Sequence, residues 1–392
     1  MADGGAFRLG IAHRLETVDP AAWDRCAGPD NPFVSHAFLS ALEDSGSATA
    51  ETGWAPHHLL LHDEASDRLV GALPLYLKSH SQGEYVFDHG WANALQQAGG
   101  RYYPKLQSCV PFTPATGPRF LAAGADDREA VIAGLARSAM ALTRDNGISS
   151  FHVTFPTAEE ADLAPQLGLL RRTGEQYHWD NNGYAAFDDF LDALNSRKRK
   201  MIRRERREAV APGIEILRLT GDDLAPEHWD AFFDFYMDTG SRKWGRPYLT
   251  RAFFTLLHQR LRERVMLVMA RRQGRWIAGA LNLIGTDALY GRNWGCVEQH
   301  PFLHFECCYY QAMDFAIERG LKRVEAGAQG EHKIMRGYVP RPTHSLHYIV
   351  EPSFRRAVDR FLVQEREAIA QEIEHLGQYL PFRHKPEDED GE

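Results

Sequence analysis

The residues best suited to chemistry lie in the stretch GAQGEHKIMRGY (327–338), which we predict to follow a strand. It holds a carboxylate, an imidazole and two cations among three glycines, and glycine permits backbone geometry that other residues avoid. Such groups can take a proton from an amine, stabilise an oxyanion or pair with phosphate. Crowding at a glycine-rich strand end favours this function over a turn whose charges face solvent. The predicted catalytic residues are Glu331, His332 and Lys333, and Arg336 is predicted to bind substrate.

Further candidates for a general base lie at the start of the predicted helix FECCYYQAMDFAIERG (305–320). Glu306 either accepts a proton from an amine or stabilises the helix N-terminus by its charge, and the sequence leaves both open. His304 and His332 titrate near neutral pH and are alternative bases, and the polar neighbours of His332 rank it first. Direct acyl transfer needs no nucleophilic side chain. The sequence has no Gly-x-Ser-x-Gly elbow, which argues against an acyl-enzyme of the α/β-hydrolase kind.

Substrate-binding residues are predicted on the preceding strand, ALYGRNWG (288–295). Tyr290, Arg292 and Trp294 occupy alternating positions, so we expect them to share one face of the strand. They would either pack into the core or line the substrate site. An arginine between two aromatic residues favours the site, because burying an unpaired cation is costly.

A second set of substrate-binding candidates lies in the aromatic, proline-rich run YYPKLQSCVPFTPATGPRF (102–120). This run contains Tyr103 and Lys105, and its aromatic residues argue against disorder. It would form a lid or an apolar acceptor wall, and a structural cover is an equal alternative.

The segment SRKRKMIRRERRE (196–208) concentrates eight cations against two glutamates in a chain of formal net charge −8. Charge runs are usually solvated helix faces, but these cations repel one another and have few acids at helical spacing. We therefore predict contact with a polyanion: a tRNA acceptor stem, the phosphates of CoA or anionic lipid headgroups. The acidic total charge argues against general nucleic-acid binding. The predicted phosphate-binding residues are Arg197, Lys198, Arg203, Arg204 and Arg207, with Arg242 and Lys243 as a second basic site.

Composition places the chain among ordinary globular proteins, with 44% hydrophobic and 25% charged residues. No apolar run approaches the length of a membrane span, and the N-terminus lacks a signal-peptide apolar region. We therefore predict a cytoplasmic protein, with peripheral contact to the inner membrane as an alternative. The five cysteines form no Cys-x-x-Cys pair, which fits a reducing compartment and predicts no metal site.

Four short motifs recur in the same order in both halves of the chain. Ordered matches of this kind predict a tandem duplication. The longest match runs over twenty residues without a gap. The matched pairs are PAAWD (20–24) with PEHWD (226–230), SHAFL (35–39) with TRAFF (250–254), HHLLLHDEASDRLVGALPLY (57–76) with VMLVMARRQGRWIAGALNLI (265–284), and Gly147 with Gly320, each ahead of a strand.

Each copy predicts two helices, a hairpin, a further strand, a helix and a closing strand at LKRVEAG (321–327) or its equivalent. This order predicts an α/β (α+β) fold built twice. We expect the basic element between the copies to line the cleft between them, since such clefts favour ligands. The predicted divisions are a first unit, 1–180, with an insertion at about 95–122; the basic element, 181–215; a second, catalytic unit, 216–380; and a disordered acidic tail, 381–392.

These residues resemble a known family. The element order is similar to that of the GNAT-like N-acyltransferase fold, and two such units resemble the Fem-type transferases that build peptidoglycan cross-bridges. The sequence more closely resembles the FemAB-like group of bacterial N-acyltransferases, to which some bacterial ceramide synthases look related. The motifs that carry the resemblance are SHAFLSALEDSG (35–46), GALPLYLKSHSQGEYVFDHGWA (71–92), YYPKLQSCVPFTPATG (102–117), SRKRKMIRRERR (196–207), HFECCYYQAMDFAIERGL (304–321) and GAQGEHKIMRGYVPRPTHSLH (327–347).

The resemblance implies transfer of an acyl group from an activated donor to an amine in cell-envelope or lipid synthesis. In Fem-type transferases a lysine after the last strand lies at the reaction centre, and Lys333 before Gly337-Tyr338 looks similar. The donor would be acyl-CoA or an aminoacyl-tRNA, with no tightly bound cofactor. A (Gln/Arg)-x-x-Gly-x-(Gly/Ala) loop, which cradles the acetyl-CoA pyrophosphate, is missing after residues 288–295, and this argues against routine acetyl-CoA use. The alternative is a non-catalytic protein that docks on RNA or membrane through residues 196–208.

Overall fold

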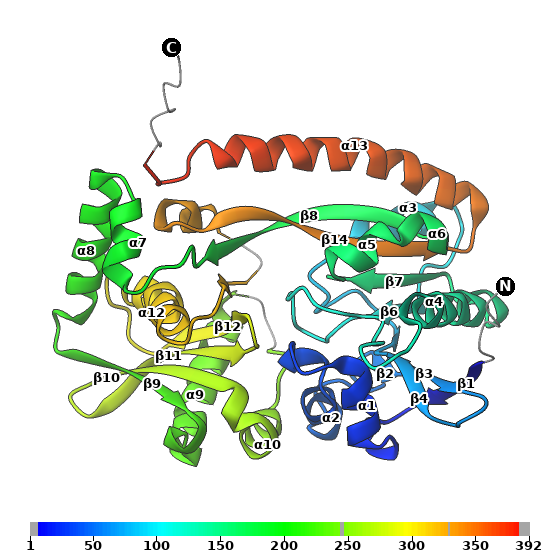
Figure 1. Cartoon of the computed structure of the whole chain (residues 1–392), viewed down its shortest axis with the longest axis horizontal. Coiled ribbons are helices and arrows are strands. Elements are labelled where there is room, and N and C mark those ends of the chain that lie inside the picture. The colour runs from blue at the N-terminus through cyan, green and yellow to red at the C-terminus, as the bar shows by residue number, and fades with distance from the viewer. Residues whose placement is uncertain (1–6, 244–246, 328–329, 384–392) are drawn as a thin grey trace, which may run out of the picture.

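The computed structural model describes residues 7–243, 247–327 and 330–383. Its strands form one sheet of eleven strands and a smaller sheet of three (Figure 1). The large sheet runs in the order β2-β5-β6-β7-β14-β8-β13-β12-β11-β10-β9, and the small sheet in the order β1-β3-β4. The strands are β1 (Phe7–Ala12), β2 (Trp54–Pro56), β3 (His58–Asp63), β4 (Leu69–Leu73), β5 (Tyr76–Lys78), β6 (Lys105–Ser108), β7 (Ser150–Thr154), β8 (Leu170–Asp180), β9 (Ile214–Thr220), β10 (Val265–Arg272), β11 (Arg275–Ile284), β12 (Ala288–Cys296), β13 (Arg323–Glu325) and β14 (Val339–Ile349).

The two halves of the chain repeat the same order of strand pairing. β1, β3 and β4 pair antiparallel in sequence, as do β9, β10 and β11. β5 pairs antiparallel with β6, as β11 does with β12, and β6 and β12 then pair parallel with β7 and β13. The matched segments 57–76 and 265–284 therefore hold the same place in this order, as the repeated motifs predict.

A proline explains the main difference between the halves. β11 runs without interruption through Asn282, whereas the matched segment of the first half is split at Pro74 into β4 and β5. Proline has no N–H group to donate to a strand ladder, so the pairing stops there. The small sheet of the first half is consequently separate from the large one.

The last strand of each half pairs within the other half. β14, from the end of the chain, pairs with β7 and β8, while β8 pairs with β13 of the second half. This exchange joins the halves into one continuous sheet. It also corrects one prediction: LKRVEAG (321–327) does not close its sheet, because β13 lies between β12 and β8. A further strand after residue 338 makes the closing pairs.

Helices cover both faces of the sheets. α9 packs on β11 and β12, α4 packs on β3, β4 and β7, and the long α13 crosses β8 and β14 (Figure 1). The α-helices are α1 (Pro20–Ala27), α2 (His36–Asp44), α3 (His89–Gln97), α4 (Arg128–Asp145), α5 (Ala158–Asp162), α6 (Ala164–Leu167), α7 (Phe187–Ala193), α8 (Ser196–Val210), α9 (Pro226–Lys243), α10 (Arg251–Leu261), α11 (Leu303–Phe305), α12 (Gln311–Glu318) and α13 (Pro352–Gly377). Within the described ranges, no helix has both the length and the apolar character needed to cross a membrane.

The predicted helix of residues 305–320 forms with a local irregularity. α11 and α12 are joined by a π turn, η5 (Glu306–Tyr310), so one helix runs from Leu303 to Glu318. Such π turns are rare in proteins, and those that occur are often found at functional sites. After β13 the chain forms a 3₁₀ turn, η6 (Glu331–Arg336), which contains the predicted catalytic stretch.

The basic segment forms α8, but not in the predicted place. The Asn195 side chain caps its first turn by accepting from the N–H of Lys198 at 3.0 Å, and Ile202 and Ala209 are buried along one stripe. α8 packs mainly on β9, α11, η5 and η6, all in the second half, at the outer end of the molecule (Figure 1). The prediction that it lines the cleft between the halves is therefore wrong, because this apolar stripe is buried by the second half.

The predicted acidic tail starts later than expected. Phe382 packs against the core of the second half and forms a β-bridge with Leu194, so residues 381–383 belong to the fold. Residues 384–392 lie outside the described residues.

Candidate functional site

The predicted catalytic stretch lies where two parallel strands separate. β12 and β13 pair only through Ala288–Tyr290 and Arg323–Glu325, after which β12 continues to Cys296 and the chain leaves β13. Glycines line the point of separation. A Cβ atom on Gly291 would lie 3.5 Å from the Ala326 Cα atom, and Gly327 has a φ of 79°, which favours glycine.

An open pocket of about 310 Å³ lies beside the outer part of β12. Its wall includes the ring of Trp294, whose centre is 5.2 Å from the centre of the His304 ring. The start of α11 supplies His304 and Leu303. The other lining residues are Thr239, Cys296, Glu298, Gln299 and His300. The pocket thus combines an aromatic wall with imidazole and carboxylate groups.

Lys333 is almost completely buried, with 2% of its surface exposed. Its Nζ atom donates to the Gly327 carbonyl at 2.9 Å, and among the described residues it has no carboxylate partner. Burial lowers the pKa of Lys333 to about 8, against a smaller opposing effect of the Cys308 thiol. An ammonium group held in this way is available to a negative charge that forms beside it.

His332 is exposed, and its ring lies near that of the pocket residue His304. Its Nε2 atom is 2.9 Å from the Tyr309 hydroxyl, and its ring centre is 6.3 Å from that of His304. Burial, and then the charges of Arg336 and Lys333, lower the pKa of His332, so the neutral imidazole is favoured near pH 7. Tyr309 was not predicted from the sequence. Its place one turn after Phe305, on the helix that begins at the pocket, was the available signal.

Arg336 holds the 3₁₀ turn η6 in place instead of facing the pocket. Its guanidinium makes a two-point ion pair with Glu205 of α8, at 3.0 and 2.7 Å, and both side chains are 4% exposed. It also donates to the His332 carbonyl at 2.8 Å and stacks on the Phe305 ring at 3.5 Å. The predicted substrate contact of Arg336 is replaced by a structural one, through an acid of the basic helix.

Glu306 has both carboxylate oxygens occupied. Arg206 of α8 donates to them at 3.0 and 3.2 Å, and Gln311 donates at 2.7 Å. Burial raises the pKa of Glu306, and the charge of Arg206 opposes this. Arg206 also pairs with Asp314 at 2.6 Å. These contacts favour a structural role over the alternative role of base, and the side chain of Glu331 lies outside those described.

The expectation that Tyr290, Arg292 and Trp294 share one face of β12 is wrong. Leu281 pairs with Asn293 and Asn282 with Gly291, so Arg292 is the extra residue of a β-bulge. A bulge shifts the alternation of side chains by one. Tyr290 consequently packs in the core that contains Phe33, whereas Trp294 packs against the core on the opposite face.

The candidates of the first half lie in a separate buried network. Lys105 is completely buried and donates to Glu84 at 2.7 Å, to Ser81 at 2.9 Å and to Asp88. The Tyr103 hydroxyl is 2.8 Å from the Ser81 hydroxyl. These contacts make Lys105 part of the first half's core, and the structure does not bring it near Lys333 or Trp294.

Several cations of α8 have acidic partners on other elements. Arg199 donates to Asp192 at 2.8 Å and Arg203 to Asp188 at 3.1 Å, both acids being on α7. These pairs, together with those of Arg206, neutralise part of the positive charge of residues 196–208. Within the described part of the chain, the cations of α8 without an ion pair are Arg197, Lys198, Lys200 and Arg207.

Three of the predicted phosphate-binding residues lie on the sides of α8 toward the pocket or toward η6. Arg204 lies over the Phe302 ring at 5.8 Å, next to the pocket residue Leu303. Burial and the charges of Arg197 and Arg336 lower the pKa of Lys198, which places Lys198 close to the catalytic turn. Helical geometry puts Arg197 on the same side as Arg204. The side chains of Arg242 and Lys243 are outside those described.

The first half has no matching opening in its described residues. β6 and β7 also pair parallel and then separate, but Arg119 lies at their ends and is completely buried. Its guanidinium donates to the carbonyls of Thr154 at 2.9 Å, Ala115 at 2.7 Å and Gly117 at 3.0 Å. The open pocket described here therefore belongs to the second half. No group of three or more potential metal-binding side chains lies together in the described ranges.

Comparisons with known proteins agree with this architecture. A family model, FemAB_like, described as peptidoglycan biosynthesis/recognition, matches residues 14–384. The crystal structure of FemX is similar, with a TM-score of 0.55 and 13% identity over 89% of this chain and 100% of that chain. A conserved protein of unknown function from Bacteroides thetaiotaomicron has a TM-score of 0.51 and 12% identity, over 88% and 100% of the two chains. No curated protein matches the sequence.

Proposed function

This chain belongs to the FemAB-like family of acyltransferases, and we therefore propose that it moves an acyl group from an activated donor to an amine at the separation of β12 and β13. The donor is an acyl thioester or an aminoacyl-tRNA. The acceptor is an amine used in cell-envelope or lipid synthesis, with a sphingoid amine as the lipid alternative.

The observation that carries this proposal is the burial of Lys333 without an acidic partner among the described residues. Burying an unpaired ammonium group is costly, and the fold does not need it for packing. Acyl transfer forms an oxyanion when the amine attacks, and a preformed positive charge beside that oxygen stabilises the transition state more than the substrate. A lysine in a glycine-rich turn, next to a histidine that lies near the open pocket, fits this task.

In the proposed reaction, neutral His332 takes a proton as the amine nitrogen attacks the acyl carbonyl. The new carbon–nitrogen bond forms, the carbonyl oxygen becomes an oxyanion near Lys333, and the bond to the donor's sulfur or oxygen then breaks. The proton held by His332 passes to that leaving group. Tyr309, hydrogen-bonded to His332 at 2.9 Å, would orient the imidazole. No acyl-enzyme is required.

The donor would lie in the pocket beside Trp294, with its phosphates toward α8. Arg197 and Arg204 are the cations on that side, Lys198 lies near η6, and arginine and lysine neutralise phosphate effectively. CoA and the acceptor end of tRNA both present phosphates next to an acyl-bearing group. The pocket accommodates either in chemical terms, so both belong in the test.

The experiment is single-turnover transfer from labelled acyl-CoA and from labelled aminoacyl-tRNA to a panel of amines. Lys333→Ala should fold and bind the donor nearly as well, and its rate should fall about a hundredfold or more, as when an oxyanion donor is removed. Lys333→Arg should restore part of the rate, because its planar fork replaces a point charge. The exposed Lys322, paired with Asp287, supplies the control Lys322→Ala. Near-normal turnover in Lys333→Ala would remove Lys333 from the mechanism and leave His332 with backbone amides.

A further inference from the structure

Arg292 lies between the two halves of the molecule without an acidic partner. It is half-buried on the bulge of β12, and its guanidinium donates to the Phe112 carbonyl of the first half. No ion pair to Arg292 exists among the described residues, and burial lowers its pKa while the Tyr85 and Tyr236 hydroxyls oppose that shift. A neutral carbonyl compensates a guanidinium only in part, so a negative charge at this position would be stabilised strongly.

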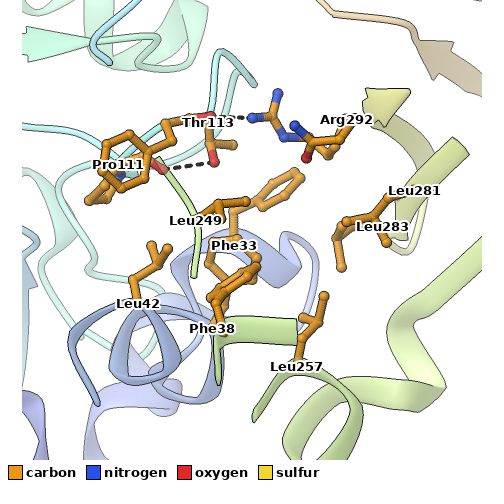
Figure 2. A pocket seen from close by; sticks show the side chains of 13 residues that line it. Phe33, Phe38, Leu42, Pro111, Thr113, Leu249, Leu257, Leu281, Leu283 and Arg292 are labelled. Atoms are coloured by element: carbon orange, nitrogen blue, oxygen red, sulfur yellow. Dashed lines mark hydrogen bonds between the residues drawn. The ribbon is translucent and has the colours of Figure 1, made fainter. Parts of the chain in front are cut away.

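The side chain of Arg292 stands at the edge of an apolar cavity between the halves (Figure 2). Phe33, Phe38 and Leu42 of the first half form one wall, and side chains of α10 and β11 form the other. The Phe33 ring lies 5.9 Å from the guanidinium. The cavity is narrow, about 10 Å³, which is room for one water molecule. The lining residues of the second half are Leu249, Phe253, Leu257, Leu281, Leu283 and Asn293.

The first half holds two strained residues against Arg292. Phe112 and Tyr85 have φ values of 59° and 60°, a region that aromatic residues rarely adopt. The Phe112 N–H donates to the Gly83 carbonyl at 3.2 Å, which joins the two turns. Phe112 lines the cavity, and its ring stacks on Tyr248 with centres 4.9 Å apart. Strained backbone of this kind is concentrated at ligand and active sites.

The cavity adjoins the reaction centre from the side opposite the donor pocket. The bulge turns Arg292 and Asn293 toward the cavity and Trp294 toward the donor pocket. Gly291, the residue before Arg292, lies 4.0 Å from the position of a Cβ on Gly327, whose carbonyl binds Lys333. A molecule anchored at Arg292 could therefore present an amine at the separation of β12 and β13.

We propose that this site binds the acceptor, and that the acceptor is an amphiphilic amine: an anionic group, carboxylate or phosphate, on Arg292, with an apolar chain in the cavity. This proposal rests on the proposed acyl transfer and adds the chemical class of the acceptor. The cavity must widen to admit the chain, since its closed form holds about one water molecule. The amine then lies within reach of His332 and the donor carbonyl.

The test is calorimetric binding of four ligands that share one chain and one amine and differ only in the head group. The probes are 2-aminotetradecanoate, its methyl ester, 2-aminotetradecyl phosphate and 2-aminotetradecanol, each below the concentration at which it forms micelles. The intact protein should bind one or both anionic probes about 10- to 100-fold more tightly than the matched neutral probe, the range for a hydrogen bond to a charged group. Preference between carboxylate and phosphate identifies the head group. Equal binding of anionic and neutral probes would overturn the proposal without any variant.

Variants separate a ligand contact from a structural one. Arg292→Gln should abolish the preference for the anionic probe and leave binding of the neutral probe within about twofold. Arg264→Gln is the matched control. Half-buried Arg264 also donates to carbonyls, that of Ile284 in its own half at 3.4 Å and that of Pro29 in the first half at 3.1 Å. If Arg264→Gln causes the same loss, or Arg292→Gln weakens all four probes equally, the site is structural. These binding results need no turnover, so they stand apart from the outcome with Lys333→Ala.

Discussion

At the residue scale, the buried charges of this protein fall into two kinds. Arg336, Glu205, Glu306 and Arg206 neutralise one another in hydrogen-bonded pairs. Lys333 and Arg292 instead donate to backbone carbonyls, Arg292 with a further hydrogen bond to the Tyr85 hydroxyl, and neither has an acid partner in the described chain. Paired charges hold α8 and η6 in place, whereas the unpaired charges are the ones that we propose to bind substrate. The difference is visible only when partners from distant segments are known.

We predict that Lys333→Met stabilises the protein at neutral pH. The pKa of Lys333 is about 8 in the folded state and 10.5 in its ordinary state, so the folded state disfavours the ammonium group. At pH 7 the side chain is charged in both states and this cost is fully present. It diminishes as pH rises from about 8 to 10.5, where the unfolded chain binds more protons. The upper bound is about 3 kcal/mol, and removal of the hydrogen bond to Gly327 reduces the net gain to about 1–2 kcal/mol.

Urea unfolding at pH 7 and at pH 10 measures this effect. The gain in unfolding free energy for Lys333→Met should be present at pH 7 and much smaller at pH 10. Lys322→Met, at an exposed lysine, should change the unfolding free energy little at either pH. A loss of stability at pH 7 in Lys333→Met would mean that the lysine is structural and that its charge is compensated.

At the element scale, α8 has three different sides. Its apolar stripe, with Ile202 and Ala209, packs on the second half, and Glu205 in that stripe binds Arg336 of η6. A second side, with Arg199 and Arg203, pairs with acids of α7. The third, with Arg197 and Arg204, faces the start of α11 and the pocket. One helix therefore supports η6 and also carries cations beside the pocket.

We predict that the sides of α8 differ in their effect on donor binding. Arg197→Gln with Arg204→Gln should reduce donor affinity and lower the slope of log affinity against log salt by roughly one for each phosphate that is no longer neutralised. Arg199→Gln with Arg203→Gln, the matched control, should change that slope less. Asp192 and Asp188 pair with these cations at 2.8 and 3.1 Å, whereas Arg204 pairs with Glu208 at the longer distance of 3.6 Å and Arg197 has no ion pair in the described chain. Filter binding of CoA and of tRNA from low to moderate salt gives both slopes. Equal slopes in the two double variants would mean that α8 is a solvated basic face that does not bind the donor phosphates.

At the scale of the whole molecule, the exchanged strands make the two halves depend on each other. β14 pairs with β8 over Val339–His347 and with β7 over Ser345–Ile349. The apolar cavity and the contacts of Arg292 also require both halves. The repeated pattern in the sequence predicts two units, but the units share strands, so neither has a complete sheet alone.

We predict that neither half folds without the other. Fragments divided at the exposed residues Asn182 and Gly183 should each aggregate, because β7 and β13 would present unpaired edges. The intact chain with a protease site inserted there should remain one particle after cleavage, with an unchanged circular dichroism spectrum. Size-exclusion chromatography distinguishes the outcomes. A soluble, cooperatively unfolding fragment of either half would show that the exchanged strands are dispensable.

Local and repeated features of this protein can be predicted from its sequence alone. Apolar alternation and the Gln273-Gly274 turn predict the β10–β11 hairpin, and the ordered motifs predict the duplication and the fold class. The crowded polar stretch at 327–338 identifies Lys333 and His332 as candidate site residues, and their catalytic roles stay predictions. Each of these features depends on residues that are close in the chain, so pattern and turn chemistry suffice to predict them.

Which residues meet depends on the tertiary structure. The exchange of β8 and β14 and the ion pairs of Glu205 and Arg206 join segments far apart in the sequence. The bulge that separates Arg292 from Trp294 and the α7 acids that neutralise α8 are nearer in the chain, but they too depend on how the elements pack. A run of arginines looks the same whether its partners are solvent, phosphate or acids of another helix. Its partners are set by packing of distant segments, and local patterning carries no record of that packing. For this reason the prediction wrongly placed α8 in the cleft between the halves. It also left Glu306 open between two roles and did not find Glu205 or Tyr309.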